Sequence, residues 1–125
     1  MDQFGVRTRV IMGDGLNSLI PQMKRVFVVT DSFMAQSGKV DYVTARLDKA
    51  RVEYEVFSDI SGEPDIGMVT AGTARMMEFG PDTVICLGGG AAIDAAKAIV
   101  FVARKAGNQK AVSYTHLTLP TTMLV

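Results

Sequence analysis

The sequence predicts an α/β fold in which a parallel β-sheet is covered by helices on both faces. Two short apolar runs, residues 25–31 (RVFVVTD) and 83–87 (TVICL), are rich in β-branched residues and suit strands buried on both sides. Helical patterns alternate with these runs, and right-handed crossovers between them make the strands parallel. The length of 125 residues is typical of one domain.

The remaining elements follow in order along the chain. Residues 8–15 (TRVIMGDG) fit a strand and a turn, and residues 16–23 (LNSLIPQM) fit a short helix. Residues 39–50 form a helical pattern whose apolar face is made by Val40, Val43, Leu47 and Ala50. Residues 52–57 (VEYEVF) alternate in polarity, which is typical of a strand nearer the sheet edge.

A second helical pattern is expected to begin at Pro64, whose fixed φ suits the first helical position. Gly80 and Pro81 should end it. A third helix is expected over residues 91–107, with Gly107 at its end. The buried stripe predicted for the second helix consists of Ile66, Val69, Thr70, Thr73, Met76 and Met77.

Composition excludes several classes of protein. Thirteen basic residues balance thirteen acidic ones, so there is no basic excess to favour nucleic acid as a partner. Cys86 is the only cysteine, which rules out a disulfide framework. No apolar stretch reaches membrane-spanning length, and the N-terminus lacks a signal-peptide pattern. A cytoplasmic protein with no membrane partner is therefore expected.

Three consecutive glycines, Gly88, Gly89 and Gly90, stand between a predicted strand and a predicted helix. Ligands of open parallel sheets bind at the carboxyl ends of strands, and a helix N-terminus there attracts phosphate. A phosphate site is one interpretation, and a tight turn with glycines chosen for close packing is the other. The motif is neither a Walker loop nor G-x-G-x-x-G, since Ile93 holds the place of the third glycine.

Charged residues near this turn also have two interpretations each. In one interpretation Asp94 complements the helix dipole and Lys97 is a solvated or paired lysine; in the other, Asp94 lies near the ribose or the nicotinamide edge of a cofactor. Asp31 ends the first core strand and is either a helix cap or an acid that binds ribose hydroxyls. An acid there would repel a 2′-phosphate and favour NAD over NADP. Asp31 precedes the glycines, whereas the acid of the usual dinucleotide fold follows them.

These motifs together resemble a known family. The motifs FVVTD, FSDISGEPDI and DTVICLGGGAAIDAAKAI, and the spacing between them, resemble the N-terminal domain of iron-containing (group III) alcohol dehydrogenases over residues 26–107. The match to the family signature G-G-G-S-x-x-D-x-A-K is strengthened by the preceding PDTVICL. The chain is most similar to the branch of propanediol-utilisation dehydrogenases and bifunctional aldehyde-alcohol dehydrogenases.

The resemblance implies a Rossmann-like N-terminal domain of a two-domain dehydrogenase. That domain binds NAD(P), and a helical C-terminal domain binds a divalent metal, usually iron. By position, Asp31 would contact the adenosine ribose and Asp94 would lie toward the nicotinamide half. Lys97 belongs to the signature, and Glu63 stands where the family often has asparagine. The pyrophosphate would be cradled by Gly89, Gly90 and Ala91, the last of which replaces the usual serine.

The resemblance implies that the metal ligands, one aspartate and three histidines, lie in the helical domain, which we expect this chain to lack. Residues 1–110 are accordingly expected to form the NAD(P)-binding domain. We expect His116, the single histidine, to be a surface residue and not a ligand. Residues 111–125 resemble translated vector sequence, and the alternative is a genuine strand followed by cofactor-binding Thr121 and Thr122.

The expected function is therefore that of an N-terminal fragment of an NAD-linked, Fe²⁺-dependent alcohol dehydrogenase. The parent enzyme would interconvert a primary alcohol and an aldehyde. A homo-oligomer is one expected assembly of the parent. This chain alone would be inactive. NADP stays open as the cofactor. One alternative is a fragment of a zinc enzyme like glycerol dehydrogenase or dehydroquinate synthase. The other is a stand-alone nucleotide-binding module without catalysis.

Overall fold

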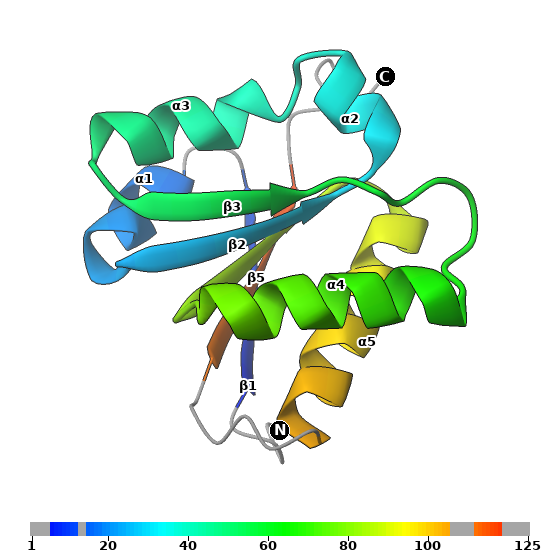
Figure 1. The fold of residues 1–125 in the computed structure, drawn as a ribbon. Helices are drawn as coiled ribbons and strands as arrows, with labels where there is room; N and C mark the ends of the chain where they lie inside the picture. Colours follow the sequence, from blue (N-terminus) through cyan, green and yellow to red (C-terminus); the bar gives the residue numbers. More distant parts are fainter. Residues whose placement is uncertain (1–5, 13–14, 106–111, 119–125) are drawn as a thin grey trace.

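A computed structural model describes residues 6–12, 15–105 and 112–118 of the chain (Figure 1). Its five strands form one sheet in which every neighbouring pair is parallel. The strand order is β1-β5-β4-β2-β3, so β2 lies between β4 and the edge strand β3. The strands are β1 (Val6–Met12), β2 (Arg25–Thr30), β3 (Glu53–Phe57), β4 (Thr83–Leu87) and β5 (Val112–Thr118).

Helices cover both faces of this sheet, which confirms the predicted fold class (Figure 1). One face packs on α4 (Ile66–Phe79) and α5 (Gly90–Lys105), and the other packs on α1 (Gly15–Leu19) and α3 (Asp41–Lys49). The strand β2 serves both cores, because Phe27 and Val29 join the first while Val26 and Val28 join the second. Two further short helices are η1 (Ile20–Gln22) and α2 (Ser32–Gln36), and α2 was not predicted.

The beginning of α4 corrects one prediction. The helix begins at Ile66, and its N-cap is Asp65, whose carboxylate accepts a 2.8 Å hydrogen bond from the Met68 amide. Pro64 therefore lies before the cap and not at the first helical position. The end was predicted correctly, because Gly80 has a φ of 66° and caps the helix in the left-handed conformation.

The buried face of α4 also differs from the predicted stripe. Thr73 and Met76 are buried as expected, and Val69 is half-buried, but Ile66, Thr70 and Met77 are exposed. Ile66 is 86% exposed. The cause is the close approach of α5, which the buried glycine at Gly72 allows. A Cβ at Gly72 would lie 2.3 Å from Ile99 Cδ1, so the helix turns its small residue toward α5.

Two other helices depart slightly from expectation. Ala50 is the exposed C-cap of α3 and not part of its buried face, whereas Val43 and Leu47 are buried. α5 begins at Gly90, so Asp94 lies beyond its first turn. Gly107, the predicted end of that helix, lies outside the described residues.

A strand of the C-terminal segment lies inside the sheet. β5 pairs with β4 on one side and with β1 on the other, and His116 is aligned with Cys86 and Val10. The alternative expectation of a strand in this segment agrees with the structure. The proposed vector origin of residues 111–125 stays a prediction.

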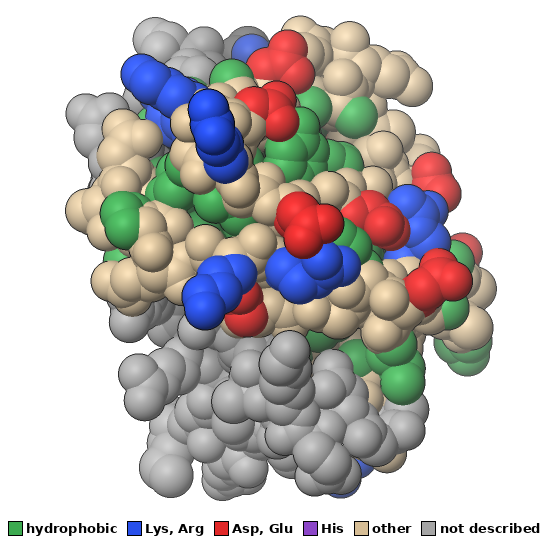
Figure 2. All heavy atoms as spheres, turned by 60° about the vertical axis from the view of Figure 1, so that its left-hand side comes forward, with side chains coloured by type: hydrophobic (Ala, Val, Ile, Leu, Met, Phe, Trp, Pro, Cys, Tyr) green, Lys and Arg blue, Asp and Glu red, His purple; other side chains and the backbone are tan. Residues whose placement is uncertain are grey.

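Charges of both signs are mixed on the described part of the face in Figure 2. Two ion pairs lie on the edge strand β3, Arg25–Glu53 at 2.7 Å and Arg75–Glu55 at 2.6 Å. Charged side chains on an edge strand disfavour pairing with a foreign strand. Across the described ranges, no helix has the length and apolar character needed to cross a membrane.

Candidate functional site

The candidate site lies where the chain reverses its direction across the sheet. From β2 the chain moves to β3 on one side, and then to β4 on the other side of β2. The connections after β2 and β4 also lead to opposite faces, toward α3 and α5. A crevice opens at such a switch point, beyond the carboxyl ends of the strands, and ligands of open α/β sheets bind there.

The glycine turn after β4 leads directly into α5. Gly88 has a φ of 141°, which a side chain would strain. The carbonyl of Gly89 accepts the Ile93 amide at 3.0 Å and thus starts the helix. The amides of Gly90, Ala91 and the next residue precede the first intrahelical bond, so they are available to a ligand. The helix dipole adds a partial positive charge at the same place.

Gly89 and Gly90 are not required by the fold itself. Neither has a positive φ, and a Cβ built on either would meet no atom of the described residues within 4 Å, apart from its own neighbours along the chain. Both residues are exposed. Side chains would therefore fit here, and the open space beside the backbone suits a ligand that approaches it closely.

Asp31 stands beside this turn, and the structure confirms one of its two predicted interpretations, the helix cap. Its Oδ1 accepts a 2.8 Å hydrogen bond from the Met34 amide and caps α2. Its Oδ2 faces the glycine turn, since it lies 3.1 Å from the position of a Cβ on Gly88. The two strand ends are also joined by the buried Thr30 hydroxyl, which donates to the Leu87 carbonyl at 2.7 Å. One oxygen of Asp31 therefore stabilises the fold, while the other lies beside Gly88 at the glycine turn.

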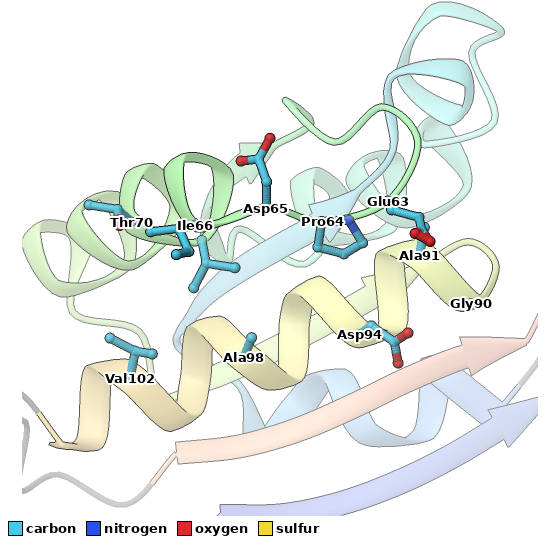
Figure 3. Close-up of a pocket in the computed structure, with 11 residues that line it drawn as sticks. Glu63, Pro64, Asp65, Ile66, Thr70, Gly90, Ala91, Asp94, Ala98 and Val102 are labelled. Carbon is cyan, nitrogen blue, oxygen red and sulfur yellow. The ribbon is translucent and has the colours of Figure 1, made fainter.

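A hollow of about 1000 Å³ extends from the start of α5 along the groove between α4 and α5 (Figure 3). Gly90, Ala91 and Asp94 line it on the α5 side. Three acidic residues, Glu63, Asp65 and Asp94, belong to its lining, and no lysine or arginine of the described residues does. The wall farther from the turn is mainly apolar and includes Ile66, Val69 and Val102.

The predicted site residues are only partly brought together. Asp31, Gly89, Gly90 and Ala91 meet at the glycine turn. Asp94 borders the hollow one turn into α5. Lys97 is exposed on the same helix and is not part of the lining. Thr121 and Thr122 lie outside the described residues.

The sequence interpretation did not foresee how two residues take part in this site. The carboxylate of Glu63 borders the hollow opposite the start of α5 (Figure 3), and the Thr30 hydroxyl joins β2 to β4. In the sequence, Glu63 is distinguished only by standing where the family often has asparagine. Thr30 could have been identified from the sequence, because it is a polar residue at the end of a buried strand and a buried hydroxyl needs a hydrogen-bond partner.

Among the residues that the structure describes, no three histidine, cysteine, aspartate or glutamate side chains are grouped closely enough to hold a metal ion. The described part of the site offers backbone donors at the start of α5 and the Asp31 carboxylate beside Gly88.

Comparison with known proteins decides the family. The family model described as iron-containing alcohol dehydrogenase matches residues 8–123, which is most of the chain. The chain belongs to the iron-containing alcohol dehydrogenase family. This confirms the resemblance that the glycine motif and the flanking strands indicated.

Relatives of known name belong to the branch that was predicted. The chain is 37% identical over 109 residues to the 1-propanol dehydrogenase PduQ of Citrobacter freundii, covering 86% of this chain and 29% of that protein. It is 46% identical over 77 residues to an aldehyde-alcohol dehydrogenase of Streptococcus pneumoniae, covering 60% of this chain and 9% of that protein. The chain thus spans less than a third of the length of either relative.

Solved structures of this family share the fold. The iron-containing alcohol dehydrogenase of Thermotoga maritima superposes with a TM-score of 0.68 at 27% identity, covering 80% of this chain and 30% of that one. An alcohol dehydrogenase from an archaeal halo-thermophile of a Red Sea brine pool gives a TM-score of 0.64 at 31% identity, covering 77% and 25%. The Rossmann-like fold of the described part is therefore that of an N-terminal domain in the iron-containing alcohol dehydrogenases.

Proposed function

We propose that this chain is the nucleotide-binding part of an NAD-linked alcohol dehydrogenase that interconverts a primary alcohol and an aldehyde. Membership of the family supports the reaction class, and the names of the two relatives support a primary alcohol as substrate. We assign nucleotide binding to residues 1–110. Iron would be held by parts of the parent enzyme outside the described residues.

One observation carries the cofactor assignment. Gly89 and Gly90 have ordinary backbone conformations and open space beside them, so neither folding nor packing explains why both are glycine. A diphosphate that lies against the backbone does explain it. The free amides of Gly90 and Ala91 would donate to its oxygens, and the α5 dipole would add attraction. Ala91 contributes only its amide, since it has no hydroxyl.

The neighbouring acid supports NAD in particular. The Asp31 Oδ2 atom lies beside Gly88 at the glycine turn, and the carboxylate would accept hydrogen bonds from ribose hydroxyls there. The same charge would repel a 2′-phosphate, so NAD should bind better than NADP. When bound, the nicotinamide supplies the hydride chemistry, and the protein supplies position and electrostatics.

The other predicted residues have weaker support. Asp94 borders the hollow and would lie near the nicotinamide half of the cofactor. Lys97 is exposed and is proposed only as part of the family signature. Thr121 and Thr122 are proposed as cofactor contacts on the family's pattern alone.

Calorimetric titration of the chain with NAD tests this function. We expect binding of NAD, and we expect Gly89→Ala to weaken it about tenfold without loss of stability, because the new methyl enters the space meant for the diphosphate. Gly67→Ala is the matched control, since Gly67 lies outside the hollow lining and a Cβ there meets only ordinary contact at 3.4 Å. Absence of NAD binding, or equal effects of the two substitutions, would contradict the proposal.

A further inference from the structure

We propose that Glu63 selects ligands by phosphate charge, so that the site admits a diphosphate that bridges two nucleosides and rejects terminal phosphate groups. This inference rests on the proposed nucleotide site. It adds a specificity-determining residue that the glycine motif does not contain.

The position of Glu63 supports this role. Glu63 lies on the loop between β3 and α4, and it lines the same hollow as Gly90 and Ala91. Figure 3 shows its carboxylate directed toward the start of α5. Glu63 is exposed and has no hydrogen-bond or ion-pair partner among the described residues, so its charge is not neutralised by a neighbour.

The surrounding charges leave little to offset this carboxylate. Among the described residues no lysine or arginine lines the hollow, and Asp94 is a second acidic residue in its lining. Asp65 also borders the hollow, but its Oδ1 is engaged with the Met68 amide. The attraction for an anion comes from backbone amides and from the α5 dipole, which is equivalent to about half a unit charge. Such a site tolerates one negative charge per phosphorus better than two.

Ligand chemistry then determines the selectivity. Each phosphorus of a bridging diphosphate carries a single negative charge, whereas a terminal phosphate carries about −1.5 to −2 at neutral pH. Repulsion by Glu63 grows in proportion to ligand charge. Glu63 should therefore lower the binding affinity most for ATP, less for ADP and least for NAD, although all three contain the same adenosine.

The test measures the affinities of the full chain for NAD, ADP and ATP by titration calorimetry. Glu63→Gln keeps the shape of the side chain and removes its charge, and Glu63→Lys reverses the charge. We expect Glu63→Gln to increase ATP affinity about three- to tenfold and NAD affinity less than twofold, with ADP between them. Glu63→Lys should give larger gains in affinity in the same order, with ATP first, ADP second and NAD last. Raising the salt concentration from about 0.05 to 0.5 M should shrink these differences.

Asp59→Asn is the matched control, because Asp59 is an exposed carboxylate in the same connection that does not line the hollow. It should leave the three affinities in their wild-type ratio. The role of Glu63 would be overturned by equal gains for all three ligands, by no gain, or by the same effect from Asp59→Asn. In each of these cases, NAD binding by the wild-type chain would still support the proposed function. Failure of the wild-type chain to bind any of the nucleotides would overturn both.

Discussion

The Oδ2 atom of Asp31 lies 3.1 Å from the position that a Cβ on Gly88 would occupy. The two residues are far apart in sequence and are brought together by the parallel pairing of β2 with β4. The bond from the Thr30 hydroxyl to the Leu87 carbonyl fixes the same two strand ends. An acid and a glycine turn thus become one site through the sheet alone.

Gly88→Ala should destabilise the chain. The φ of 141° is unfavourable for alanine, and the new Cβ would lie 3.1 Å from both Ala92 Cβ and Asp31 Oδ2. We expect a loss of about 1–3 kcal/mol in the free energy of unfolding, measured by urea denaturation. Gly90→Ala is the control and should be neutral or stabilising by up to about 1 kcal/mol. Equal losses for both would contradict the geometry described.

Two substitutions separate the roles of Asp31. Asparagine caps a helix as well as aspartate does, so Asp31→Asn should keep stability, whereas Asp31→Ala should lose about 1 kcal/mol. Both should reduce the preference for NAD over NADP, because both remove the negative charge beside the ribose. Denaturation and nucleotide titration measure the two effects independently. An unchanged preference in Asp31→Asn would argue against a cofactor role.

Gly72→Ala should disrupt the contact between α4 and α5. The added Cβ would lie 2.3 Å from Ile99 Cδ1 and 3.1 Å from Phe57 Cε2. Overpacking of this kind costs about 1–3 kcal/mol, which thermal unfolding would reveal. Ile99→Val removes Cδ1, so the double variant should lose less unfolding free energy than the sum of the two single variants. Strictly additive effects would be the contrary result.

Thr73→Val should stabilise the chain. The Thr73 hydroxyl is buried and has no hydrogen-bond partner among the described residues. Valine has nearly the same shape and no polar group, so the unfolding free energy should rise by about 1 kcal/mol. Thr70→Val, at an exposed position on the same helix, should change it little. A loss of stability in Thr73→Val would mean that the hydroxyl has a partner.

Stability should fall at high pH because of Tyr54. Burial, together with the nearby Asp48 carboxylate, raises the pKa of the Tyr54 hydroxyl above its ordinary value of 10.0. The folded chain then holds this proton more tightly than the unfolded chain does. The resulting stability is complete below the unfolded pKa and is lost as the pH rises through the folded pKa. Denaturation above about pH 10 should show less of this loss in Tyr54→Phe.

Local sequence was sufficient for the core strands, the C-terminal end of α4 and the glycine turn. The apolar runs of β2 and β4 predicted doubly buried strands because such strands need apolar residues on both faces. Gly80 predicted a helix end because it adopts a left-handed conformation easily. The position of Asp31 at a strand end made it a candidate site residue. The sequence could not show that one carboxylate oxygen caps α2 while the other lies beside Gly88.

Tertiary structure alone decided which helix faces are buried and which residues meet. Helical periodicity predicted a stripe on α4, yet Ile66 is exposed and Gly72 is buried, because the orientation of the helix depends on the close approach of Ile99 on α5. Glu63 could not be placed at the site from its own neighbours, since the hollow is formed by chain segments from opposite sides of β2. The sequence by itself therefore determined the fold class, the strands and the glycine turn, where the cause is local. Strand order and helix packing decided the composition of the site, because they depend on contacts between residues distant in the chain.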